Sequence, residues 1–215
     1  DTIDSMSMGS AGMAIPSIVD HLEFEENNAD FILVVETSAM VNRLVEEDFH
    51  AEHNAIIIGT GGQPARGARR LINMMHNELD LPVYVFTDGD PWGYYIYSVL
   101  KSGSMSLAFQ SDRLATPDAK LIGMTMEDIE EYGLEHVTED LKGKSEDNGG
   151  PTKDYKRIHD VRDYEWMQNE DWQKQLQLML DKGVRVEQQA LAANSLEFVA
   201  NEYLPEKIEN ETFLD

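Results

Sequence analysis

The sequence contains no cysteine, few basic side chains and no long apolar run. The absence of cysteine excludes a disulfide-stabilised fold, a thiolate zinc site and a cysteine nucleophile. No apolar stretch approaches the roughly 18–20 residues that a membrane-spanning helix needs, and no basic segment leads into an apolar one as in a secretory signal. We therefore expect a soluble, cytoplasmic protein. Because the chain starts at Asp1 instead of a methionine, we also expect it to be part of a longer protein.

Acidic side chains greatly outnumber basic ones. The chain has 41 Asp and Glu against 17 Lys and Arg, for a formal net charge of −24. Its 41% hydrophobic residues distinguish it from a disordered acidic tail, which cannot form a core. A folded chain with this charge repels itself in dilute buffer, whereas salt at 1 M screens charges over about 3 Å. We therefore predict an adaptation to high salt, as in a halophile; the alternative is an ordinary acidic cytosolic protein.

The acids are unevenly distributed, and two stretches contain none. These are His53–Asn77 and Pro91–Ser111. We interpret them as a surface from which negative charge has been removed for a function, so the overall acidity does not exclude a nucleic acid as partner. The Lys and Arg residues within the two stretches are Arg66, Arg69, Arg70 and Lys101.

Short apolar, β-branched runs alternate with helical patterns in the first half of the chain. Such runs are typical of strands that are buried on both faces of a parallel sheet, and strands separated by helices pair in parallel. The pattern predicts an α/β fold with a mainly parallel, Rossmann-like central sheet flanked by helices. Strands are expected at 31–35, 55–58, 82–86, 105–109 and 119–122, with helices over 37–49, from about 64 and over 91–101.

The sequence divides into three parts. Residues 1–28 form an irregular lead-in or linker, residues 29–125 form the core, and residues 126–215 form a helical C-terminal extension that completes the domain. Loop composition near 142–152 predicts a mobile excursion. In the extension we expect helices over 172–180 and 187–199, broken at Gly183, with Leu204-Pro205 ending the second.

Three acids follow predicted strands at their carboxyl ends, where ligands bind in such sheets. Glu36 ends the first strand, and Asp88 and Asp90 follow the third with Gly89 between them. Magnesium is usually held by one or two carboxylates, which leaves positions for water and a phosphate. An isolated Asp-Gly-Asp is more often a plain turn. However, three converging acids repel one another unless a cation neutralises them, so we predict a metal site.

A glycine loop with a basic helix start follows the second strand. Gly61 and Gly62 precede Arg66, Arg69 and Arg70. Backbone N–H groups at a helix start attract phosphate, although the loop has neither the P-loop nor the GxGxxG pattern. Beside a metal site the loop indicates a phosphodiester ligand, and we predict that these residues and Lys101 contact DNA.

With these motifs the chain resembles a known family, the Toprim domain of the A subunit of archaeal type IIB DNA topoisomerases (topoisomerase VI). The resemblance extends over nearly the whole chain, and the Asp88–Gly93 motif is its most specific part. The matching segments are Gly9–Pro16, Val34–Thr37, Gly59–Arg66, Thr87–Gly93, Met179–Val184, Glu187–Leu191 and Glu202–Ile208.

The resemblance implies roles for the acids and identifies partners. Glu36, Asp88 and Asp90 match the family's Mg²⁺ ligands, and Glu36 would also act as general acid or base. The metal would hold a phosphodiester while a tyrosine attacks it, giving a double-strand break that is later religated. That tyrosine belongs to an N-terminal domain, and no tyrosine here matches its motif, so this chain alone should not cleave. Expected partners are double-stranded DNA, an ATP-hydrolysing B subunit and a second copy of the A subunit, with location at the nucleoid.

Two other interpretations remain open from the residues alone. A nucleotide-sugar transferase would bind its donor through Mn²⁺ or Mg²⁺ at Asp88 and Asp90 and would give Glu36 no role. A non-catalytic interaction domain would bind no metal at these acids.

Overall fold

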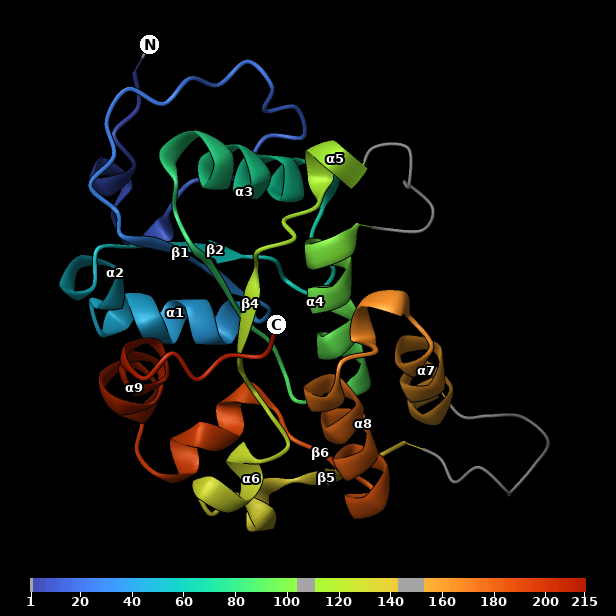
Figure 1. The fold of residues 1–215 in the computed structure, drawn as a ribbon. Helices are drawn as coiled ribbons and strands as arrows, with labels where there is room; N and C mark the ends of the chain where they lie inside the picture. Colours follow the sequence, from blue (N-terminus) through green and yellow to red (C-terminus); the bar gives the residue numbers. More distant parts are fainter. Residues whose placement is uncertain (1, 104–110, 143–152) are drawn as a thin grey trace.

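The computed structural model describes residues 2–103, 111–142 and 153–215, and its centre is a parallel sheet (Figure 1). The sheet has four strands in the order β2-β1-β3-β4, and every neighbouring pair is parallel. The predicted α/β fold with a parallel central sheet is therefore confirmed. The strands are β1 (Phe31–Val35), β2 (Ala55–Gly59), β3 (Val83–Phe86) and β4 (Lys120–Gly123).

Helices connect the strands and make up most of the C-terminal half. Across the described ranges, every helix is too short or too polar to span a membrane. The α-helices are α1 (Ser38–Glu46), α2 (Phe49–Glu52), α3 (Arg66–Leu79), α4 (Pro91–Ser102), α5 (Ser111–Leu114), α6 (Asp128–Glu131), α7 (Lys153–Arg162), α8 (Glu170–Lys182) and α9 (Leu204–Glu209). Shorter elements are the 3₁₀ segments Ser5–Ala11, Glu135–Val137, Glu165–Met167 and Gln188–Ala193, the π-helical segment Val199–Tyr203, and the hairpin strands β5 (Glu139–Asp140) and β6 (Val184–Arg185).

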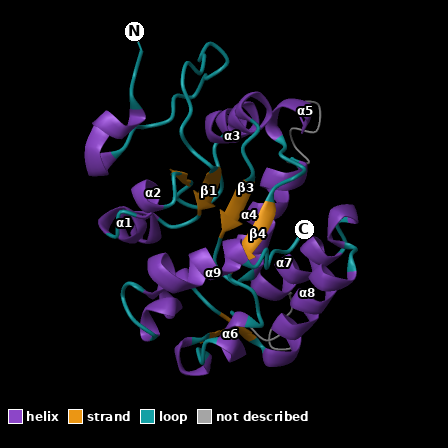
Figure 2. Ribbon diagram, turned by 60° about the vertical axis from the view of Figure 1, so that its left-hand side comes forward, coloured by secondary structure: helices purple, strands orange, loops and turns teal. Residues whose placement is uncertain are grey.

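The sheet is buried because helices cover both of its faces. All five residues of β1 are buried, as expected for a central strand between two helical layers. Helices α1 and α3 lie on opposite sides of the sheet (Figure 1), which follows from right-handed crossovers that leave β1 and β2 in opposite directions. The strands point toward α9 and the α6 region (Figure 2). The carboxyl ends of the strands therefore face the C-terminal extension.

The C-terminal extension is fastened to the core by aromatic and ionic contacts. Trp172 of α8 is fully buried and packs on Tyr94 and Tyr97 of α4, with ring centroids 5.1 and 5.2 Å apart. On α9, the Lys207 ammonium lies 2.7 Å from a carboxylate oxygen of Asp128, which is fully buried. These contacts make the extension part of the same hydrophobic core.

The N-terminal segment packs against α3. Val19 is buried, and Asp20 pairs with Arg70 at 2.7 Å and with Arg113. A Cβ atom at Gly67 would lie 2.3 Å from the carbonyl oxygen of Pro16, so this glycine allows the close approach. The predicted lead-in therefore contacts the core, and its role as a linker stays a prediction.

Several expected elements differ in the structure. The expected helix over 187–199 is wrong, because a 3₁₀ segment ends at Ala193 and a separate π-helical segment begins at Val199. Leu204-Pro205 begins α9 instead of ending a helix, since proline is tolerated in the first helical turn. The helix expected over 37–49 breaks at Asp48, which adopts a left-handed conformation. The expected strand 105–109 and most of the loop near 142–152 lie outside the described residues.

Candidate functional site

Glu36 and Asp88 meet at the carboxyl ends of β1 and β3. The backbone N–H of Glu36 donates to the carbonyl oxygen of Phe86 at 3.1 Å, which continues the pairing of the two strands. The backbone N–H of Asp88 donates to Oε2 of Glu36 at 3.0 Å. The parallel register that aligns Val35 with Phe86 therefore places these two acids side by side, as the sequence predicts.

Asp90 occupies the N-cap of α4. Its Oδ1 accepts hydrogen bonds from the backbone N–H groups of Trp92 at 2.9 Å and Gly93 at 2.6 Å, which satisfies donors that have no partner within the helix. A Cβ atom at Gly93 would lie 2.1 Å from the carbonyl oxygen of Asp88. The close approach of α4 to the carbonyl oxygen of Asp88 therefore requires glycine at the third position of the helix.

The three carboxyl groups have raised pKa values. Burial, followed by repulsion from Asp88 and Asp90, raises the pKa of Glu36 to about 8. Burial and the neighbouring Asp90 raise the pKa of Asp88 to about 6. Burial also raises the pKa of Asp90, although its cap hydrogen bonds and Arg185 oppose the shift. Removing three negative charges from water in one place is costly, and a cation would lower that cost.

The segment after β6 contacts Asp88 and the end of β3, and reasoning from the residues alone missed it. Gln188 is fully buried. Its backbone N–H donates to Oδ1 of Asp88 at 2.8 Å, and its Nε2 donates to the carbonyl oxygen of Phe86 at 2.8 Å. The hydroxyl of Thr37 donates to Gln188 Oε1 at 2.9 Å. Gln188 thus connects the residues that follow Glu36 to those around Asp88.

The donor chemistry of this site fits a hard divalent cation. Carboxylate oxygens are the ligands that Mg²⁺ prefers, and each acid keeps an oxygen that is not used in the amide hydrogen bonds above. Within the described ranges, no three Asp, Glu or His side chains are gathered around a common point as a preformed metal cage. The residues therefore supply the right atoms, and their oxygens would have to converge on an ion.

The glycine loop lies beside Glu36. The backbone N–H of Gly62 donates to the carbonyl oxygen of Glu36 at 3.0 Å. Gly61 and Gly62 have φ values of 60° and 99°, which favour glycine, and a Cβ atom at either would meet no atom within 4 Å. No side chain caps the start of α3 at Ala65. The structure thus brings the loop and the acids together.

The Lys and Arg side chains predicted to contact DNA differ in burial and in their partners. Arg69 is 5% exposed, and its Nε and one terminal nitrogen have no hydrogen-bond partner. Arg70 is paired with Asp20. Lys101 pairs with Asp215 and donates to the carbonyl oxygen of Ala119 at 3.3 Å, just before β4. It therefore lies at the amino end of the strands, and the structure does not bring it to the acidic site.

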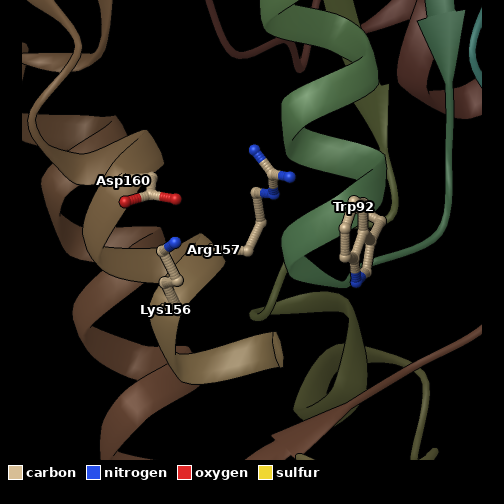
Figure 3. A pocket seen from close by; sticks show the side chains of 4 residues that line it. All are labelled: Trp92, Lys156, Arg157 and Asp160. Carbon is tan, nitrogen blue, oxygen red and sulfur yellow. The ribbon is translucent and has the colours of Figure 1, made fainter. Parts of the chain in front are cut away.

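A shallow hollow of about 250 Å³ lies between α4 and α7 (Figure 3). Trp92, Lys156, Arg157 and Asp160 line it. The Arg157 guanidinium lies over the rings of Trp92 and Tyr95, 4.4 and 4.3 Å from their centroids. These stacking contacts join α7 to the first turns of α4, close to Asp90.

Comparison with known proteins places the chain in a family. Residues 31–208 match the family described as the Toprim domain of the topoisomerase 6 A subunit and Spo11. The A subunit of type 2 DNA topoisomerase 6 from Pyrococcus abyssi is 57% identical over 209 residues, covering 97% of this chain and 55% of that protein. The protein of the same name from Haloarcula marismortui is 45% identical over 202 residues, covering 94% and 52%.

The chain spans about half the length of the curated relatives it matches. The family match covers the parallel sheet, the three acids and the segment with Gln188. It gives no support to a nucleotide-sugar transferase. The chain belongs to the family of Toprim domains found in Spo11 and in the A subunit of topoisomerase 6.

Proposed function

We propose that this chain is the metal-binding part of the A subunit of a type IIB DNA topoisomerase. It would support Mg²⁺-dependent cleavage and religation of both strands of a DNA duplex, used for ATP-dependent relaxation and decatenation. The nucleophilic tyrosine would lie outside these 215 residues, and ATP would be bound by a partner B subunit. Two copies of the A subunit would be needed to complete the assembly, which would act at the nucleoid.

The observation that carries the proposal is the placement of three acids at the carboxyl ends of β1 and β3, where the backbone N–H of Asp88 donates to Glu36 and Asp90 caps α4. Glu36, Asp88 and Asp90 would hold Mg²⁺, which supplies Lewis-acid stabilisation of phosphate oxygens. Glu36 would also exchange a proton with a leaving 3′-oxygen. The glycine loop and the start of α3 would position the DNA backbone without reading its sequence.

Titration calorimetry of the 215-residue chain with Mg²⁺ tests the proposal. We expect saturable binding that Asp88→Asn and Glu36→Gln each weaken by about tenfold or more, because each removes a ligand charge. Glu78→Gln, which neutralises an exposed acid on α3, is the matched control and should bind as the wild type does. Equal Mg²⁺ affinity in all four proteins would instead favour a non-catalytic interaction domain.

A further inference from the structure

Arg185 is the cation that the fold places among the acids. On β6, its NH1 lies 3.7 Å from Oδ2 of Asp90. Its side chain is only 11% exposed, and its positive charge also acts on Asp88. Nothing in the resemblance or in the motifs of the first half of the chain assigns this residue a role.

The position of Arg185 is fixed by its neighbours on both sides. Glu139 of β5 pairs with it in the hairpin register and accepts hydrogen bonds from its Nε at 3.1 Å and from NH2. The next residue, Val186, exchanges two backbone hydrogen bonds with Gly89, of 2.8 and 3.1 Å. The turn between Asp88 and Asp90 is therefore fastened directly to the strand that carries Arg185.

The guanidinium is only partly used by these contacts. Glu139 occupies the Nε and NH2 edge, whereas NH1 is 3.7 Å from Asp90, which is too long for a hydrogen bond. Oδ1 of Asp90 is meanwhile committed to the start of α4. Within the described part of the chain, NH1 therefore faces the acidic site without a close acidic acceptor.

We propose that NH1 of Arg185 binds a non-bridging phosphate oxygen of the DNA backbone held at the acidic site; this rests on the proposed function. Three ionised carboxylates and one Mg²⁺ leave a net charge of minus one, which would repel a phosphodiester. The Arg185 guanidinium, whose other edge is paired with Glu139, reduces this repulsion on the side of Asp90. Arginine suits this task because its planar guanidinium has several N–H donors. NH1 can therefore bind a phosphate while Nε and NH2 stay paired with Glu139.

This role predicts opposite effects on the two ligands, measured with the 215-residue chain. In Arg185→Gln, Mg²⁺ should bind about threefold or more tightly in calorimetry, because a competing positive charge beside the carboxylates is gone. Binding of a fluorescein-labelled 20-base-pair duplex in Mg²⁺ should weaken by about tenfold. The slope of log affinity against log salt should also fall by about one. Arg185→Lys keeps the charge and should retain wild-type Mg²⁺ affinity.

Lys182→Gln is the matched control, because it removes one exposed positive charge nearby on α8. It should leave Mg²⁺ affinity within about twofold of wild type. Thermal melting in EDTA checks folding. If Arg185→Gln unfolds, the double variant with Glu139→Gln replaces it, because Glu139 is then not left as a carboxylate without its cation. A purely structural role predicts weaker Mg²⁺ binding and a lower melting temperature.

The inference and the proposed function can fail separately. If wild type binds Mg²⁺ and Asp88→Asn does not, but Arg185→Gln matches Lys182→Gln for both ligands, only the inference is overturned. Unchanged or weaker Mg²⁺ binding in Arg185→Gln also overturns it. If the wild type binds no Mg²⁺, or Asp88→Asn binds it equally well, the proposed function fails and the inference fails with it.

Discussion

Replacing Glu36 by glutamine should remove a large part of the pH dependence of stability. The folded-state pKa of Glu36 is about 8, against an ordinary value of 4.5. Between these values the folded chain binds more protons than the unfolded chain, so the free energy of unfolding falls as the pH rises. From pH 6.5 to 8.5 this one carboxyl group should lower that free energy by roughly 2 kcal/mol. Asp88, with a pKa of about 6, contributes little in this range.

Urea denaturation in EDTA at both pH values measures the effect. Between pH 6.5 and 8.5, the free energy of unfolding should fall by roughly 2 kcal/mol more in the wild type than in Glu36→Gln. The variant should be the more stable protein at pH 8.5. Contributions that are the same in both proteins cancel in the comparison. Glu78→Gln, on an exposed position, should keep the wild-type pH dependence. The same loss in wild type and Glu36→Gln would refute the burial and repulsion argument for this site.

Three further predictions concern the fold and its charge. Gly93→Ala should lower the free energy of unfolding by about 2 kcal/mol or more, because its Cβ would press on the carbonyl oxygen of Asp88. A variant that denatures at the same urea concentration as the wild type would contradict this. Lys207→Met should cost about 3 kcal/mol by leaving the fully buried Asp128 without its cation, and adding Asp128→Asn should recover part of it. The net charge of −24 predicts a melting temperature that rises between about 0.1 and 2 M KCl; a fall would contradict the halophilic interpretation.

The sheet and the approach of Glu36 to Asp88 are predictable because they depend on local pattern and on one topological rule. Phe31–Val35 is apolar at every position, which indicates a strand covered on both faces. Parallel strands end at the same edge of a sheet, and because β1 and β3 are neighbours in this sheet, the acids that follow them lie close together. The hydrogen bond between Glu36 and Asp88 follows from this rule.

The C-terminal half of the site is not predictable in this way, because it depends on contacts between distant parts of the chain. Gln188 binds Asp88 and Phe86 across about a hundred residues, and no periodicity or motif chemistry marks it. Arg185 reaches Asp90 only because β6 pairs with β5 and Gly89 bridges to Val186. Leu204-Pro205 shows a related limit, since proline is compatible with both a helix end and a helix start.

The position of a bound metal ion tests the central claim most directly. Crystals of the 215-residue chain soaked in Mn²⁺ and measured at the manganese absorption edge would locate the ion by anomalous scattering. The account predicts a peak at direct ligand distance, about 2.0–2.3 Å, from carboxylate oxygens of Asp88 and of Glu36 or Asp90. An ordered Mn²⁺ ion bound elsewhere, with no peak among these three acids, would contradict it.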